Sequence, residues 1–91
     1  MGGIKEQTRQ ALMDIKNNLE IMGASLKHIV MLRYYVRHPV DLFAFRDEMY
    51  RFYRKFEPDL LENPRPTTLL NGVGIALPDF RIEIEAIAIV P

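Results

Sequence analysis

The chain of 91 residues contains no cysteine. It therefore forms no disulfide and offers neither a thiol nucleophile nor a thiolate ligand for a metal. An excess of charge is also missing, because 12 basic side chains balance 12 acidic ones. A neutral balance argues against a basic surface that follows nucleic-acid phosphates, so we expect no nucleic-acid partner.

Long apolar runs are absent as well. No stretch approaches the roughly 20 apolar residues of a membrane span, and no signal-peptide pattern is present. We therefore expect no membrane partner and a cytoplasmic location. No repeat, low-complexity tract or linker divides the chain, so residues 1–91 are predicted to form a single domain.

The common catalytic patterns are missing too. The sequence has no glycine-rich phosphate loop and no Ser/His/Asp arrangement with a recognisable context. Its two histidines, His28 and His38, lie ten positions apart without the spacing of metal ligands. We therefore expect no metal site, and each histidine is interpreted as a surface or strand-end residue.

The run from Phe80 to Val90 alternates with a period of two, which is typical of a strand. Its apolar face comprises Ile82, Ile84, Ala86, Ala88 and Val90. Its other face comprises Arg81, Glu83, Glu85, Ile87 and Ile89. Carboxylates and isoleucines cannot both be satisfied by water, so we expect a second copy of the chain to cover this face. For Glu85, a solvated strand end explains the pattern equally well.

Two further stretches have helical periodicity. Apolar residues at spacings of three and four predict a helix from about Lys5 to Met22, followed by a left-handed cap at Gly23. Asp41 is expected to cap a second helix that runs to about Phe56, with its tyrosines at the margin of the apolar stripe.

The remaining stretches predict strands and a loop. Residues 26–37 are rich in β-branched and aromatic side chains and form a predicted strand, with Val30 and Leu32 on one face and Ile29 on the other. Residues 57–66 are a predicted loop, and residues 67–75 a strand that forms a C-terminal hairpin with the last one.

The order helix, strand, helix, strand, strand predicts an α+β fold of two layers with both helices on one face of the sheet. The two strands joined through a helix are expected to be parallel. The other sheet face would be bare in a monomer and would carry Ile29, Met31, Arg33, Tyr35, Arg37, Glu83, Glu85, Ile87 and Ile89. Oligomerisation is the best way to bury such a face, so we infer a homo-oligomer.

Charged residues supply the candidate chemistry. An arginine that grips a substrate carboxylate, beside a glutamate that holds or activates water, would form a site for a carboxylate-bearing metabolite. Glu83 is the candidate catalytic residue, and Arg65, Glu85 and Arg33 are candidates for substrate binding. Charge pairing between subunits explains the same residues, and spacing alone favours that plainer interpretation.

The run Ile82–Ala88, IEIEAIA, resembles the C-terminal signature of the RidA/YjgF family of enamine/imine deaminases. Residues 7–12 and 23–26 are similar to that family's first helix and its exit, and the later elements follow in the family's order. The resemblance implies a chorismate-mutase-like fold and a homotrimer with ligand clefts between subunits. It also implies hydrolysis of 2-aminoacrylate-type enamines and imines to 2-ketoacids and ammonia, without a cofactor.

The chain departs from the family's pattern at several positions. Glu83 matches the family's water-positioning glutamate, but Pro66 stands where the substrate-binding arginine is expected, one step from Arg65. Asp47 takes the place of an expected asparagine. Family members also begin with strands before the first helix, and we expect those strands to be absent here.

Two interpretations therefore stay open. The chain is an enamine/imine deaminase, or it is a non-catalytic relative that binds a ligand or a protein partner. An RNA-cleaving activity, which is sometimes attached to this family's names, has little support in a neutral chain.

Overall fold

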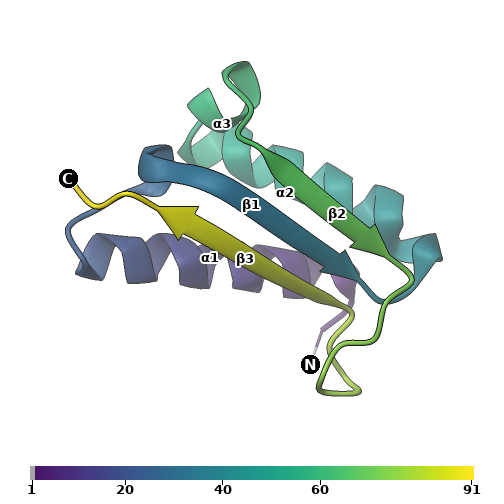
Figure 1. Cartoon of the computed structure of the whole chain (residues 1–91). Helices are drawn as coiled ribbons and strands as arrows, with labels where there is room; N and C mark the ends of the chain where they lie inside the picture. The colour runs from purple at the N-terminus through teal and green to yellow at the C-terminus, as the bar shows by residue number, and fades with distance from the viewer. Residues whose placement is uncertain (1) are drawn as a thin grey trace.

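The computed structural model describes residues 2–91. Three strands form one mixed sheet, and the two long helices pack on the same face of it (Figure 1). The helices are α1 (Ile4–Ile21) and α2 (Leu42–Phe56), and the strands are β1 (Ile29–Val36), β2 (Thr67–Asn71) and β3 (Ile82–Ala88). Short helical turns lie at η1 (Leu26–His28), η2 (Pro39–Asp41) and α3 (Asp59–Glu62). The architecture is the predicted α+β arrangement of two layers.

The central strand of the sheet is β1, which separates β2 from β3. It pairs in parallel with β2, as expected for strands joined through a helix, and antiparallel with β3. The predicted C-terminal hairpin is therefore wrong, because β2 and β3 are not neighbours. The predicted strand over residues 67–75 is also too long. The N–H groups of Gly72 and Val73 both donate to the Val36 carbonyl, at 2.8 and 3.3 Å, and Gly72 has φ of 74°, which turns the chain out of the sheet.

The start of β1 also differs from the prediction. Residues 26–28 form the turn η1 rather than the first part of a strand. A register shift against β3 follows Ile29 and reverses the expected alternation, because such a shift changes the face on which a side chain lies. Ile29 is therefore buried and Val30 is exposed. From Leu32 onward the alternation is the predicted one.

The loop predicted over residues 57–66 contains the short helix α3, so it is only partly irregular. The predicted left-handed cap of the first helix is confirmed, because Gly23 has φ of 80°. Asp41 precedes α2 as expected, but its side chain makes no capping hydrogen bond, since η2 leads directly into the helix.

The core lies between the sheet and the two helices. Tyr34 of β1 packs edge-on against Phe45 of α2, with ring centroids 5.2 Å apart, an arrangement that contributes about 1 kcal/mol beyond burial. The hydroxyls of Tyr34 and Tyr53 are 2.6 Å apart, so one of them donates a hydrogen bond to the other. Tyr53 is therefore a core residue, although the sequence placed it at the margin of the helix.

The face of the sheet away from the helices is not covered by any element of residues 2–91 (Figure 1). We call it the open face, and it carries Met31, Arg33, Tyr35, Thr68, Leu70, Glu83, Glu85 and Ile87. In the described part of the chain, neither long helix is apolar enough to cross a bilayer.

Candidate functional site

Three predicted site residues lie together on the open face. Strand pairing places Arg33 opposite Glu85, and places Tyr35, two residues further along β1, opposite Glu83. Arg33 and Glu83 are thus diagonal neighbours, a relation in which Cα atoms lie about 7–8 Å apart on adjacent antiparallel strands. A small metabolite can bridge two side chains at that separation.

Arg33 and Glu83 are also available to a ligand. Both side chains are exposed, and among residues 2–91 neither takes part in an ion pair or a side-chain hydrogen bond. Arginine presents a planar fork of donors that matches a carboxylate, and an ionised glutamate accepts hydrogen bonds from water. The pair can therefore hold an anion and a water molecule on one surface.

Glu85 has a partner within the chain. The Tyr35 hydroxyl donates a hydrogen bond to its Oε1 atom. This bond to a carboxylate raises the pKa of Tyr35 above its ordinary value of 10.0, while the charge of Arg33 acts in the opposite direction. Glu85 is therefore fixed in place, and Glu83 is the carboxylate that remains unpaired on the described open face.

The Arg37 side chain is not free on the open face, although the sequence predicted it there. Its Nε donates to the Phe80 carbonyl at 2.8 Å, and its Nη2 donates to the carbonyls of Ile75 and Leu77 at 2.5 and 2.9 Å. The guanidinium therefore holds the long connection between β2 and β3. Backbone carbonyls leave no pattern in a sequence, so this role could not be foreseen.

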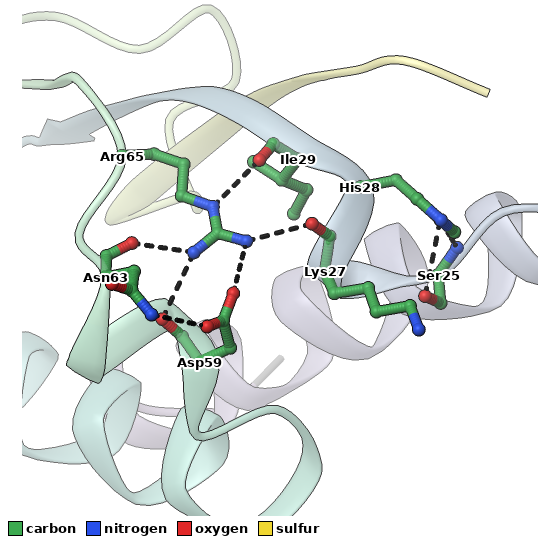
Figure 2. Close-up of polar contacts among 7 residues, drawn as sticks. All are labelled: Ser25, Lys27, His28, Ile29, Asp59, Asn63 and Arg65. Carbon is green, nitrogen blue, oxygen red and sulfur yellow. Dashed lines mark hydrogen bonds and ion pairs between the residues drawn. The ribbon is translucent and has the colours of Figure 1, made fainter. Parts of the chain in front are cut away.

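Arg65 lies at the other end of β1 from Glu83 and has its own set of partners (Figure 2). Its Nε donates to the Ile29 carbonyl at 2.9 Å, and Nη2 donates to the Lys27 carbonyl at 2.8 Å and to Asp59 Oδ2 at 2.7 Å. Its Nη1 donates to the carbonyls of Asp59 and Asn63, at 3.1 and 2.6 Å.

These five bonds use all five N–H groups of the guanidinium. The Arg65 side chain is only 13% exposed. The pKa of Asp59 is lowered from its ordinary 3.8, first by the hydrogen bond from Asn63 and then by that from Arg65. A binding role for Arg65 stays a prediction; of the two candidate arginines, Arg33 is the one whose guanidinium has no partner among residues 2–91.

Figure 2 also shows the turn that Arg65 anchors. The Ser25 N–H donates to His28 Nδ1 at 2.9 Å, which closes the turn η1 that carries the Lys27 carbonyl. His28 thus lies half-buried in η1, directly before β1, where the sequence predicted a surface or strand-end residue. Residues 2–91 contain no cluster of three or more His, Asp or Glu side chains suited to a metal ion.

Asp47, which takes the place of the family's asparagine, lies on α2 in the helical layer. It pairs with Lys5 at 3.1 Å and with Arg51 at 3.3 Å. The Lys5 contact is the main reason that the pKa of Asp47 is lowered. Within the described chain its charge is directed to these cations rather than to the open face.

Taken together, these features define a small α+β protein of chorismate-mutase-like architecture whose sheet presents a charged, uncovered face. The chain belongs to the RidA/YjgF family, since the family profile described as "Endoribonuclease L-PSP" matches residues 1–90. A RutC family protein of Pyrococcus horikoshii is 37% identical over 87 residues, or 96% of this chain. A 2-iminobutanoate/2-iminopropanoate deaminase of Dermatophagoides farinae is 27% identical over 89 residues, or 98% of this chain.

A solved structure shares this fold. The structure of TdcF from E. coli superposes with a TM-score of 0.83 at 19% identity, and the match covers 98% of this chain and 66% of that one. At that identity the likeness concerns the fold alone. The chain spans 63% of the length of each of the two sequence relatives.

Proposed function

We propose that the chain binds a small carboxylate-bearing metabolite on its open face, where a neighbouring subunit completes the site, and hydrolyses reactive enamines or imines of the 2-aminoacrylate type. The observation that carries the proposal is the pairing of two unengaged groups, the Arg33 guanidinium and the Glu83 carboxylate, at diagonal positions of β1 and β3.

The roles follow from the chemistry of each group. Arg33 grips the substrate carboxylate through two parallel hydrogen bonds, and Glu83 orients the water that attacks the imine carbon. Tyr35 fixes Glu85 beside Arg33, so that this second carboxylate limits the orientations available to the guanidinium.

The reaction is a hydrolysis. The enamine first takes up a proton on its terminal carbon and becomes an imine. Water then adds to the imine carbon with help from Glu83, and collapse of the adduct breaks the carbon–nitrogen bond. 2-Aminoacrylate and water thereby give pyruvate and ammonia, and no redox partner is required.

Two comparisons support a ligand of this kind. The mite relative is named a 2-iminobutanoate/2-iminopropanoate deaminase, and the E. coli TdcF structure contains bound serine, which is also a carboxylate. Since this chain covers only part of each relative, the transfer of substrate and activity is part of the proposal.

A second function is favoured by the state of Arg65. Pro66 stands at the expected place of the binding arginine, and Arg65 beside it has no free donor. A relative in which Arg33 binds the carboxylate but no turnover follows is the alternative, and the same experiment separates the two.

The test is ammonia release from freshly generated 2-aminoacrylate, with pyruvate binding measured by calorimetry alongside. Glu83→Gln should lower kcat by at least about 100-fold while pyruvate still binds, because general-base assistance contributes about 100-fold or more. Arg33→Met should instead raise KM and abolish pyruvate binding.

Glu62→Gln is a matched control, since Glu62 is an exposed glutamate on α3, outside the open face. Binding of pyruvate without ammonia release by the wild type establishes the non-catalytic alternative. Unchanged pyruvate binding in the Arg33→Met variant would refute the site.

A further inference from the structure

One hydroxyl proton of the core has no acceptor within the described chain. The hydroxyls of Tyr34 and Tyr53 share a single hydrogen bond, although the two groups together carry two O–H donors. The two residues are only 4% and 2% exposed. Leaving a buried donor unpaired is costly, so the second O–H requires an acceptor that residues 2–91 do not supply.

A pocket with a volume of about 540 Å³ is lined by both tyrosines. It lies between α2, α3 and the start of β2, on the helix-facing side of the sheet and therefore away from the open face. In Figure 1, α3 lies beside α2, and the chain then enters β2. The apolar residues of its lining are Leu32, Met49, Leu60, Leu61 and Pro64. Small-molecule sites typically have roughly 300–1,000 Å³ and a mostly apolar lining, so the pocket is suited to such a ligand.

The charge available at this pocket is positive. Arg54 of α2 lines it with an exposed side chain and takes part in no ion pair among residues 2–91. Arg65 also lines it, but its five donors are already used. None of the described residues in the lining is an aspartate or a glutamate. The buried end of the pocket therefore offers a neutral hydrogen-bond donor, and its exposed end offers a cation.

We infer that this pocket binds an aryl carboxylate with an oxygen atom at the far end of its ring, such as a 4-hydroxyphenyl acid. The far oxygen accepts the spare proton of the Tyr34–Tyr53 pair, the ring contacts the apolar lining, and the carboxylate pairs with Arg54. A rigid ring keeps the two polar ends apart at a low cost in conformational entropy.

Water is a poorer occupant of the whole pocket. An ordered water molecule needs about two to four polar partners, whereas most side chains of this lining are apolar. A purely apolar ligand is also a poorer occupant, because it would leave the tyrosine proton unpaired. The combination of one buried donor, an apolar wall and one free cation therefore selects a ligand with all three matching parts.

The probe is 4-hydroxyphenylacetate, titrated calorimetrically into the full chain. Phenylacetate, which lacks the far oxygen, should bind about threefold or more weakly, because it forgoes one neutral hydrogen bond. The alcohol 4-hydroxyphenylethanol, which lacks the carboxylate, should bind at least about tenfold more weakly, because it forgoes a charge-assisted pair with Arg54. These two comparisons measure the two ends of the pocket separately.

Variants assign each difference to its residues. Tyr34→Phe combined with Tyr53→Phe removes both hydroxyls and leaves no donor unpaired, so the fold should be retained and the two acids should bind equally. Arg54→Gln should weaken binding of both acids by at least about tenfold. Lys55→Gln is the matched control, since it makes the same charge change one residue further along α2, outside the pocket lining, and should leave binding unchanged.

Three results would overturn the inference. One is failure of the wild type to bind 4-hydroxyphenylacetate, and another is equal binding of the two acids by the wild type. The third is loss of 4-hydroxyphenylacetate binding in the Arg33→Met variant, because that result places the acid on the open face. None of these results depends on ammonia release, so the proposed activity and this second site succeed or fail independently.

Discussion

Replacement of Arg65 by methionine should destabilise the fold severely. The substitution keeps most of the aliphatic stem but removes the hydrogen bonds to the carbonyls of Lys27, Ile29, Asp59 and Asn63. At about 1 kcal/mol for each such bond, the free energy of unfolding should fall by about 4 kcal/mol. A domain of this size is typically stable by about 5–15 kcal/mol, so this loss is a large fraction of the total.

Equilibrium unfolding in urea, followed by circular dichroism, measures the effect. Arg33→Met is the matched control, because Arg33 is exposed and has no partner among residues 2–91, so its loss should change stability by about 0.5 kcal/mol or less. Arg65→Lys should restore only part of the stability, since an ammonium has three donors where five are used. A loss below about 1 kcal/mol for Arg65→Met would refute the structural role of this network.

Four further predictions concern pH and assembly. The pKa of Asp59 is lower in the folded chain than its ordinary 3.8, so its contribution to stability is present above pH 3.8 and is lost as the pH falls below that value. Asp59→Asn should remove this part of the acid dependence, which urea titrations repeated between about pH 2 and 5 measure. Burial raises the pKa of Tyr34 to about 12 and raises that of Tyr53 as well, so stability should be complete below pH 10 and fall as the pH rises through about 12, with a shallower fall in Tyr53→Phe. Glu85→Gln should lower the pKa of Tyr35, which ultraviolet absorbance titration in a Tyr50→Phe background measures, because Tyr50 is exposed and would otherwise contribute. An unchanged titration would contradict the hydrogen bond. We expect light scattering to give the mass of a trimer. Ile87→Lys on the open face should reduce it to the mass of one protomer, whereas Val40→Lys in η2 should not. Equal masses for the two variants would exclude the open face as the interface.

The alternation of β3 was the most informative part of the sequence. It predicted an apolar side against the helices and a charged side away from them, and both are confirmed, since Ile82 is buried while Glu83 and Glu85 are exposed. Periodicity succeeds here because the side-chain direction in a strand depends only on position. The grouping of Arg33 with Glu83 and Glu85 on one face follows from the same rule.

The errors arose where long-range partners decide the structure. The predicted hairpin assumed that consecutive strands are neighbours, although residues 72–81 form a connection longer than the 2–5 residues typical of hairpin loops. The sequence prediction extended both strands and left only residues 76–79 between them, a length within that range, so the true connection was hidden.

The structural role of Arg65 could not be predicted for a related reason. Its partners are carbonyl groups from segments up to 38 positions away, and every residue type has a carbonyl. A local pattern was available only for α3, where Pro58 stands before the helix and Asn63 follows Asp59 by four positions. Recognition of that helix would have placed a carboxylate near Arg65.

The central position of β1 has a consequence for synthesis on the ribosome. Within residues 2–91, β1 is synthesised before both of its partner strands, which end 35 and 52 residues after Val36, at Asn71 and Ala88. At roughly 5–20 residues per second, both edges of β1 wait about 2–10 seconds for their partners. Among residues 2–91, α1 and then α2 are the elements that can shield its apolar side during that interval, so we expect both helices to form before β1 gains its partner strands.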